Sequence, residues 1–206
     1  MKQTLTIVDY RMGNLNSVKK KLDRLKTTVS ITSNPKDIVK ADKIILVGVG
    51  HFAKAMKNIK ELNLLDALNE VVIVKKKPVL GICLGMQLMA KDSEEGKTEG
   101  LGWLDANVRK MQVDDTLKFK IPHTGWNKII QSKKSHLMKG IPELSEFYFV
   151  HSYYLRSNET SNILNETEYC FKFTSAIEKD NIFGVQYHPE KSHDVGEALL
   201  KNFISL

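Results

Sequence analysis

The hydrophobic residues of the first hundred positions follow two alternating spacings. Short, largely apolar runs predict strands at residues 3–9, 27–32, 43–50 and 78–82. Between them, apolar residues recur at every third or fourth position, which predicts helices at 14–26, 35–41 and 84–92, and one or two more within 52–74. We expect Asn14 to cap the first helix and Pro35 to begin the second. This alternation indicates a doubly wound α/β fold, with a mostly parallel central sheet flanked by helices.

After residue 100 the pattern changes to short strand-like segments that are separated by turns. They lie at 106–113, 117–122, 146–155, 169–177 and 181–187. An apolar stripe then predicts a docking helix at 194–206, with its apolar side made by Val195, Ala198, Leu199 and Phe203. We therefore expect an added antiparallel β region in the C-terminal half. The 206 residues fit a single domain that spans 1–206.

Composition and charge limit the cellular location and the binding partners that we expect of this protein. Hydrophobic residues make up 42% of the chain and charged residues 27%, and no apolar run approaches the ~20 residues that span a bilayer. The first residues also lack the apolar region of a signal peptide. The net charge is +7, and basic residues cluster in runs such as 19–26 and 75–77. No aromatic residues lie among these lysines, as they would in many nucleic-acid-binding surfaces. We therefore expect a cytoplasmic protein that binds neither nucleic acid nor membrane.

Of the two cysteines in the chain, only Cys83 has neighbours that suggest chemistry. Gly81 and Gly85 flank it where a predicted strand passes into a predicted helix. This pattern matches the G-x-S-x-G nucleophile elbow with cysteine in place of serine. The helix N-terminus would favour a thiolate, and its N–H groups could bind an oxyanion. We expect a nucleophile at Cys83, with a small buried thiol as the alternative, and a core or sheet thiol at Cys170.

A thiolate enzyme also needs a base and a group that orients the base. In the segment GVQYHPE, His188 and Glu190 are two residues apart at the end of an apolar strand. Extended backbone places such residues on one face, and Pro189 favours extended backbone at His188. We expect His188 to take the proton of Cys83 while Glu190 orients the imidazole. An H-x-E pair on its own is more often structural, so the prediction depends on its combination with the elbow.

The glycine-rich segment GVGHFA (48–53) allows two interpretations. It follows a predicted strand and is similar to a dinucleotide-binding fingerprint, with Asp66 and Glu70 at about the distance of the ribose-binding acid. Both acids, however, fall inside a predicted helix instead of at the end of a second strand. The favoured interpretation is a loop beside the nucleophile whose backbone amides bind an oxyanion. The alternative is a non-catalytic subunit that binds a nucleotide.

Motifs along nearly the whole chain resemble the class I, triad-type glutamine amidotransferases. The elbow and the HPE segment mark the class as a whole. Three further segments are similar to the glutaminase subunits of imidazole glycerol phosphate synthase: DYRMGN (9–14), PHTGWN (122–127) and FVHSYY (149–154).

The resemblance implies a role for each matching residue. Cys83 would attack the side-chain amide of glutamine, with His188 and Glu190 completing the triad. The family pattern further assigns the oxyanion hole to Leu84, Val49 and Gly50, and the glutamine contacts to Gln87, Glu95, Ser152 and Tyr153. It implies no metal and no organic cofactor.

The resemblance also implies a partner. In this family a (β/α)8-barrel cyclase subunit forms a heterodimer with the glutaminase, receives the ammonia and makes imidazole glycerol phosphate and AICAR for histidine biosynthesis. By analogy, the partner-facing residues are Tyr10, Arg11, Asn14 and Trp126.

Three positions depart from the family pattern. Arg11 stands where a small residue is usual, Val47 where proline is usual, and His193 where many members have glycine. The last feature leaves open a paralogous glutaminase that supplies ammonia for amidino-sugar synthesis in surface polysaccharide. A stand-alone cysteine hydrolase or peptidase with the same triad is a further alternative.

Overall fold

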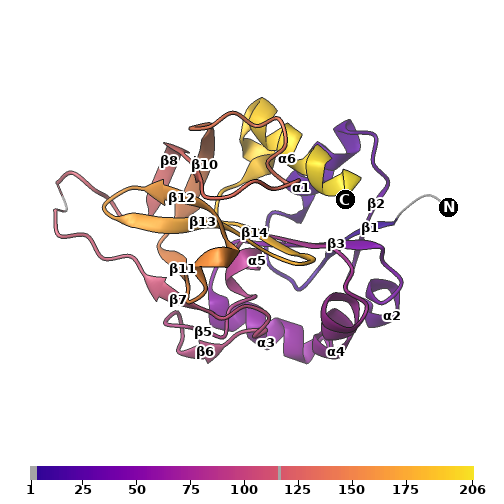
Figure 1. The fold of residues 1–206 in the computed structure, drawn as a ribbon. Coiled ribbons are helices and arrows are strands. Elements are labelled where there is room, and N and C mark those ends of the chain that lie inside the picture. Colours follow the sequence, from indigo (N-terminus) through magenta and orange to yellow (C-terminus); the bar gives the residue numbers. More distant parts are fainter. Residues whose placement is uncertain (1–3, 116) are drawn as a thin grey trace.

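A twisted sheet runs through the molecule with helices on both of its faces (Figure 1). The computed structural model describes residues 4–115 and 117–206, and twelve strands within these ranges form that sheet. One half of the sheet is parallel, in the order β2 (Val29–Thr32), β1 (Leu5–Val8), β3 (Lys43–Gly48), β4 (Val79–Cys83) and β14 (Ile182–Val185). The predicted doubly wound α/β fold is therefore confirmed.

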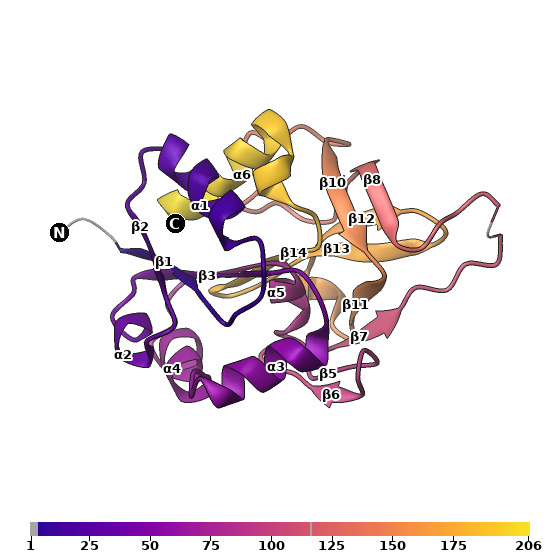
Figure 2. The same ribbon diagram turned by 180° about the vertical axis from the view of Figure 1, so that it is seen from behind.

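Helices bury both faces of this parallel half. Every residue of β1, β3, β4 and β14 is buried, as their apolar runs predict. Figures 1 and 2 show α1 (Leu15–Arg24) and α6 (His193–Ser205) on one face. The other face carries α2 (Pro35–Ile38), α3 (Phe52–Glu61) and α4 (Leu65–Asn69), which a π-helical turn (Glu70–Val74) continues. Each face has its own hydrophobic cluster, one around Phe52 and Ile59 and the other around Leu22 and Phe203.

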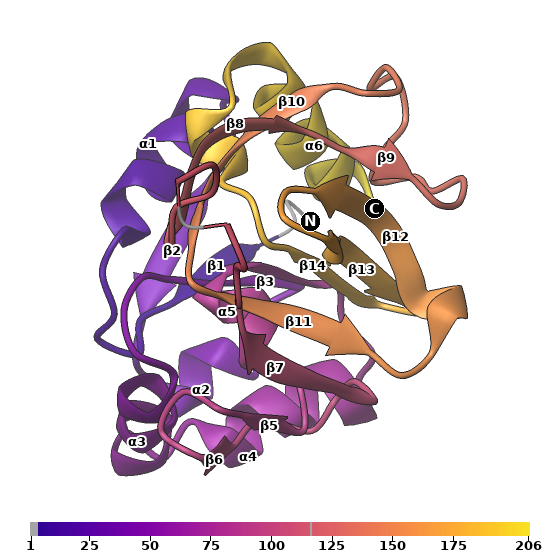
Figure 3. The same cartoon turned by 90° about the vertical axis from the view of Figure 1, so that its left-hand side faces the viewer.

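The other half of the sheet is mostly antiparallel. Beyond β14 come β13 (Lys172–Lys179), β11 (Tyr153–Ser157), β7 (Ala106–Lys110), β5 (Asp92–Ser93) and β6 (Thr98–Glu99). Off this path, β12 (Ile163–Glu168) pairs with β13 and with β9 (Ile130–Gln131), and a short 3-10 helix (Thr160–Asn162) precedes it. A separate antiparallel ribbon, β8 (His123–Lys128) with β10 (Glu146–His151), arches over this half (Figure 3). The predicted antiparallel region is thus present.

Two local predictions were wrong, and a third was right only in position. Asn14 stands at the N-cap position of α1 as predicted, but its backbone is left-handed (φ 82°) and its side chain makes no capping bond. The helix expected over 84–92 is only α5 (Leu84–Gln87), since the carbonyls of Leu88 and Met89 accept hydrogen bonds from the returning segment at Leu101 and Leu104. Residues 117–122 form a turn at 117–118 and a bend at 121–122 instead of a strand.

The C-terminal helix follows the prediction, since Leu199 and Phe203 of α6 are fully buried. Pro35 begins α2, where the Asn34 side chain accepts from the Lys36 N–H at 3.0 Å. Within the described ranges, no helix combines the length and the apolar character that crossing a membrane would require.

Candidate active site

Parallel pairing brings the carboxyl ends of three strands to one edge of the sheet. β3 ends at Gly48 and β4 at Cys83, and these two residues are partners in the register. On the other side of β4, Ile82 pairs with Val185, the last residue of β14. The residues that follow β14 therefore emerge beside Cys83. The topology thus joins the elbow, the glycine loop and the HPE segment, which are far apart in the sequence.

Cys83 lies on a sharp turn between β4 and α5. Its backbone angles are φ 54° and ψ −112°, which are strained for a residue with a side chain. A Cβ atom at Gly85 would lie 1.8 Å from the Leu46 carbonyl oxygen, and one at Gly81 would lie 2.6 Å from the Met86 nitrogen. Both flanking residues must therefore be glycine. This geometry is that of a nucleophile elbow, and it holds the thiol at the start of a helix.

His188 and Glu190 form a buried pair next to Cys83. His188 Nδ1 lies 2.8 Å from Glu190 Oε1, and both side chains are inaccessible to solvent. Burial lowers the pKa of His188, but interactions with Cys83 and Glu190 outweigh burial and raise that pKa to about 9. Among the described residues, the other ring nitrogen, Nε2, has no hydrogen-bond partner. The ring is therefore held at one nitrogen and free to exchange a proton at the other.

Asn14 completes the support of this pair. Its side-chain Nδ2 donates to Glu190 Oε1 at 2.6 Å. Burial raises the pKa of Glu190, but the hydrogen bonds from His188 and Asn14 outweigh it and hold the pKa below its ordinary value. Sequence reasoning missed this contact, because nothing in the local pattern links position 14 to position 190.

A cavity of about 320 Å³ opens beside Cys83. It brings together every residue that was predicted for the oxyanion hole and for glutamine binding: Leu84, Val49, Gly50, Gln87, Glu95, Ser152 and Tyr153. The remaining lining residues are Cys83 itself, Pro122, Val150 and His151. The pocket is large enough for an amino acid, and polar groups converge in it.

Several of these polar groups are fixed by hydrogen bonds. Glu95 Oε2 accepts from the backbone N–H of Phe52 at 2.7 Å, at the start of α3, where the helix dipole favours a carboxylate. Gln87 Nε2 donates to the Tyr153 carbonyl at 3.0 Å. Leu84 is the first residue of α5, so its backbone N–H has no hydrogen-bond partner within that helix and can donate a hydrogen bond to an anion.

A pair of buried histidines, which sequence reasoning also missed, supports the pocket wall. His151 Nδ1 lies 2.8 Å from the Tyr153 carbonyl oxygen, which can only accept, so this nitrogen carries the proton. His151 Nε2 then accepts from His123 Nδ1 at 3.1 Å, and His123 Nε2 accepts from Asn127 at 3.3 Å. Burial lowers the pKa of His151 to about 3 and that of His123 to about 4, so both rings are neutral.

The four residues predicted to face a partner differ in their exposure to solvent. Tyr10 is fully buried in the same hydrophobic cluster as Phe52, with its hydroxyl against Gly48 at the end of β3, so the prediction that its side chain faces a partner was wrong. Arg11 is exposed and Asn14 is half-buried. Trp126 is 45% exposed and stacks on His193 with ring centroids 4.9 Å apart.

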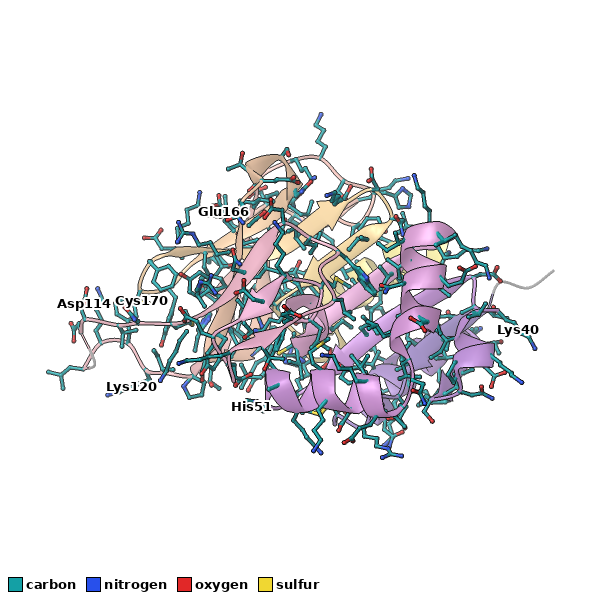
Figure 4. The ribbon with its side chains drawn as sticks, turned by 90° about the horizontal axis from the view of Figure 1, so that it is seen from below. Lys40, His51, Asp114, Lys120, Glu166 and Cys170 are labelled. Carbon is teal, nitrogen blue, oxygen red and sulfur yellow. The ribbon has the colours of Figure 1, made fainter. Side chains whose placement is uncertain are left out.

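Cys170 lies in a bend outside the strands and packs only at the edge of the core, so the prediction of a core or sheet thiol was right only in part. It occupies the turn between β12 and β13, is half-exposed and has its sulfur 3.6 Å from the Gln112 carbonyl oxygen. Partial burial raises the pKa of this thiol. Figure 4 places it beside Asp114, on the opposite side of the molecule from Lys40. Within the described residues, no group of histidine, cysteine and acidic side chains could hold a metal ion.

Comparisons with known proteins agree with this geometry. The family model described as glutamine amidotransferase class-I matches residues 6–206. The imidazole glycerol phosphate synthase subunit HisH 2 of Methanococcus maripaludis is 50% identical over 97% of this chain and 98% of the relative. HisH 1 of Campylobacter jejuni is 47% identical over 98% of this chain and all of the relative, and HisH 2 of Pseudomonas aeruginosa is 43% identical over 98% and 99%.

Solved structures match the fold at much lower identity. A glutamine amidotransferase from Thermotoga maritima superposes with a TM-score of 0.68 at 16% identity, covering 100% of this chain and 82% of that one. The glutaminase domain of Trypanosoma brucei CTPS also gives 0.68, at 18% identity, with 98% and 94% covered. With the family match and near-complete coverage of relatives at 43–50% identity, the chain is an enzyme of the class-I glutamine amidotransferases and belongs, within them, to the imidazole glycerol phosphate synthase HisH subunits.

Proposed function

We propose that this chain hydrolyses glutamine through a Cys83–His188–Glu190 triad and delivers the ammonia to a cyclase subunit that makes imidazole glycerol phosphate. The observation that carries the proposal is the position of Cys83. Cys83 lines the glutamine-sized pocket, and the buried His188–Glu190 pair follows directly from β14, the strand that lies beside β4 in the sheet. The family match supports the same chemistry.

The reaction would run in two halves. The Cys83 thiolate attacks the side-chain carbonyl carbon of glutamine, and the N–H groups of Leu84 and of the Val49–Gly50 loop bind the oxyanion. The His188 imidazolium gives its proton to the leaving nitrogen, so ammonia departs and a glutamyl thioester remains. Neutral His188 then takes a proton from water, which attacks the thioester. The C–S bond then breaks, which releases glutamate and the Cys83 thiolate, and His188 keeps the proton from water, so the starting thiolate–imidazolium pair is restored.

Delivery to a partner is supported by the surroundings of Val49. This residue lines the glutamine pocket and also a second hollow of about 430 Å³ next to Met12, Asn14 and Lys191. One thin loop therefore separates the site of ammonia release from an open surface. Free ammonia is mostly protonated at neutral pH and loses its nucleophilicity, so a cyclase docked over this hollow would have to receive it directly. Exposed Arg11 and Trp126 are the proposed contacts to that partner.

The test is glutamate release from glutamine by the purified chain, alone and with the (β/α)8-barrel cyclase subunit of the same organism and its nucleotide ligand. We expect strong stimulation by the cyclase and complete loss of activity in Cys83→Ala, while Cys170→Ala keeps full activity. Undiminished hydrolysis by Cys83→Ala would overturn the triad. Full turnover without any cyclase would instead indicate a stand-alone hydrolase.

A further inference from the structure

A buried amide, Gln186, lies between the nucleophile and the pocket wall. It follows β14 directly and is fully buried, and its backbone N–H donates to the Ser175 carbonyl of β13 at 2.8 Å. Its side-chain Nε2 lies 3.6 Å from the Cys83 sulfur, and its Oε1 accepts from Gln87 Nε2 at 2.9 Å. Gln186 therefore contacts the reacting sulfur with one end and a pocket-lining residue with the other.

The direction of this hydrogen-bond chain is fixed by the backbone. The Tyr153 carbonyl can only accept, so Gln87 must present its nitrogen there, at 3.0 Å. The second N–H of the same nitrogen then donates to Gln186, which must present its oxygen to Gln87. The nitrogen of Gln186 is thereby turned toward the sulfur. If both amides were reversed, the Gln87 oxygen would face the Tyr153 carbonyl oxygen, and two acceptors cannot form a hydrogen bond.

This direction matters for the charge on the sulfur. A donor that points at the sulfur stabilises the thiolate, which accepts hydrogen bonds more strongly than the thiol does. When the sulfur is protonated, the thiol can donate only a weak hydrogen bond, to the Val150 carbonyl oxygen at 3.9 Å. Because Gln186 is fully buried, its N–H donor acts in low-dielectric surroundings, where it is electrostatically stronger than in water and shifts the balance toward the anion.

We propose that Gln186 is a positioning residue that holds the Cys83 sulfur in its nucleophilic, anionic form and links it to Gln87 in the glutamine pocket. The proposal rests on the proposed glutaminase function. Both N–H groups of Gln87 are occupied, so only its carbonyl oxygen is left to meet the substrate. Gln87 would therefore accept a hydrogen bond from an N–H group of the substrate glutamine. Substrate binding would then strengthen the series of hydrogen bonds that runs from Gln87 through Gln186 to the Cys83 sulfur.

The test uses the reactivity of the thiol instead of turnover. Cys170→Ser leaves Cys83 as the single thiol of the chain. In that background, the rate of alkylation by iodoacetamide is measured against pH for the unmodified site and for Gln186→Met, which keeps the volume but removes the donor. We expect the half-maximal pH to move upward by about one unit and alkylation at neutral pH to slow about tenfold.

Two further variants keep the test decisive if Gln186→Met folds poorly. Gln186→Glu replaces the donor by an acceptor and should move the half-maximal pH further in the same direction. Gln87→Met releases the Gln186 oxygen and should give a smaller upward shift. The control is Asn165→Leu, which removes another fully buried amide on β12 and should lower thermal stability without moving the half-maximal pH.

An unchanged half-maximal pH in the Gln186 variants, together with a lowered melting temperature, would overturn the proposal and make Gln186 a purely structural residue. The result is independent of the glutaminase assay, since alkylation needs no glutamine. If the shift appears while the wild type releases no glutamate with any cyclase, the role of Gln186 stands and the proposed function falls.

Discussion

The side-chain amide of Asn14 hydrogen-bonds to the carboxylate of Glu190 over 2.6 Å, although the two residues are 176 positions apart in the sequence. Asn14 belongs to the surface segment between β1 and α1, and it also lines the hollow that we assign to the cyclase. One residue therefore touches both the proposed docking surface and the carboxylate that we propose orients the catalytic base.

Replacing Asn14 by leucine should slow glutamate release about tenfold at a saturating concentration of the cyclase. The substitution removes a hydrogen bond to a buried charged group, which contributes roughly 1.5–3 kcal/mol. Gln112→Leu, at an exposed amide outside that hollow, is the control and should keep the wild-type rate. Equal rates for Asn14→Leu and the wild type would show that His188 and Glu190 orient each other without help.

Cys83→Gly should be more stable than Cys83→Ala by about 1–2 kcal/mol. The reason is the backbone at this position, where φ is 54° and a Cβ atom is strained. Both variants lack the thiol and should be inactive, so urea denaturation of the pair isolates the backbone effect. An alanine variant as stable as the glycine variant would mean that the turn relaxes once the sulfur is gone.

Gly85→Ala should lower the free energy of unfolding by about 3 kcal/mol or more, or prevent folding. Its new Cβ would lie 1.8 Å from the Leu46 carbonyl oxygen, which belongs to the central strand β3 and cannot move freely. Gly102→Ala is the control, because its Cβ would meet nothing within 4 Å, although φ is 69° there. That change should cost about 1 kcal/mol from backbone strain alone. Similar losses in the two variants would contradict the close-approach argument.

Acid should destabilise the protein through His123 and His151. Their pKa values in the folded protein are about 4 and about 3, because both rings are buried, whereas in the unfolded chain they titrate near 6.5. Between these values the unfolded state binds more protons, so the free energy of unfolding falls as pH is lowered from about 6.5 to 4.

His123→Phe should reduce the slope of this acid limb by about 1.4 kcal/mol per pH unit, since one proton-binding difference is lost. Phenylalanine suits the site because the imidazole stacks on Phe149 and Tyr169. Urea denaturation at several pH values gives the slope, with His136→Gln at the surface as the control. An unaltered slope in His123→Phe would assign the acid sensitivity to other groups.

The parallel half of the fold and the elbow could be predicted because their causes are local. The run 44–50 carries no polar side chain since both faces of β3 are covered, and Gly81 and Gly85 are fixed by atoms of the same turn and of the neighbouring strand. The HPE segment could be matched to Cys83 because a thiolate needs a base.

The features that were missed depend on partners that are distant in the sequence. β12 was not predicted, because the polar residues Asn165 and Thr167 look like surface residues, yet both are buried against the side chains of Tyr187 and Ser175. β8 was missed for a similar reason, since His123 is polar but buried. The roles of Asn14 and Gln186 likewise follow only from the pairing of strands and could not be read from their neighbours.

The position of β14 has a consequence for synthesis on the ribosome. This strand lies between β4 and β13 in the sheet, yet it follows both in the chain. Until residues 182–185 have emerged, one edge of β4 lacks its partner, and such an edge invites aggregation. The proposed base, His188, also emerges only after β14. A nascent chain is therefore prone to aggregation, and under the proposed mechanism it is inactive until β14 completes the sheet.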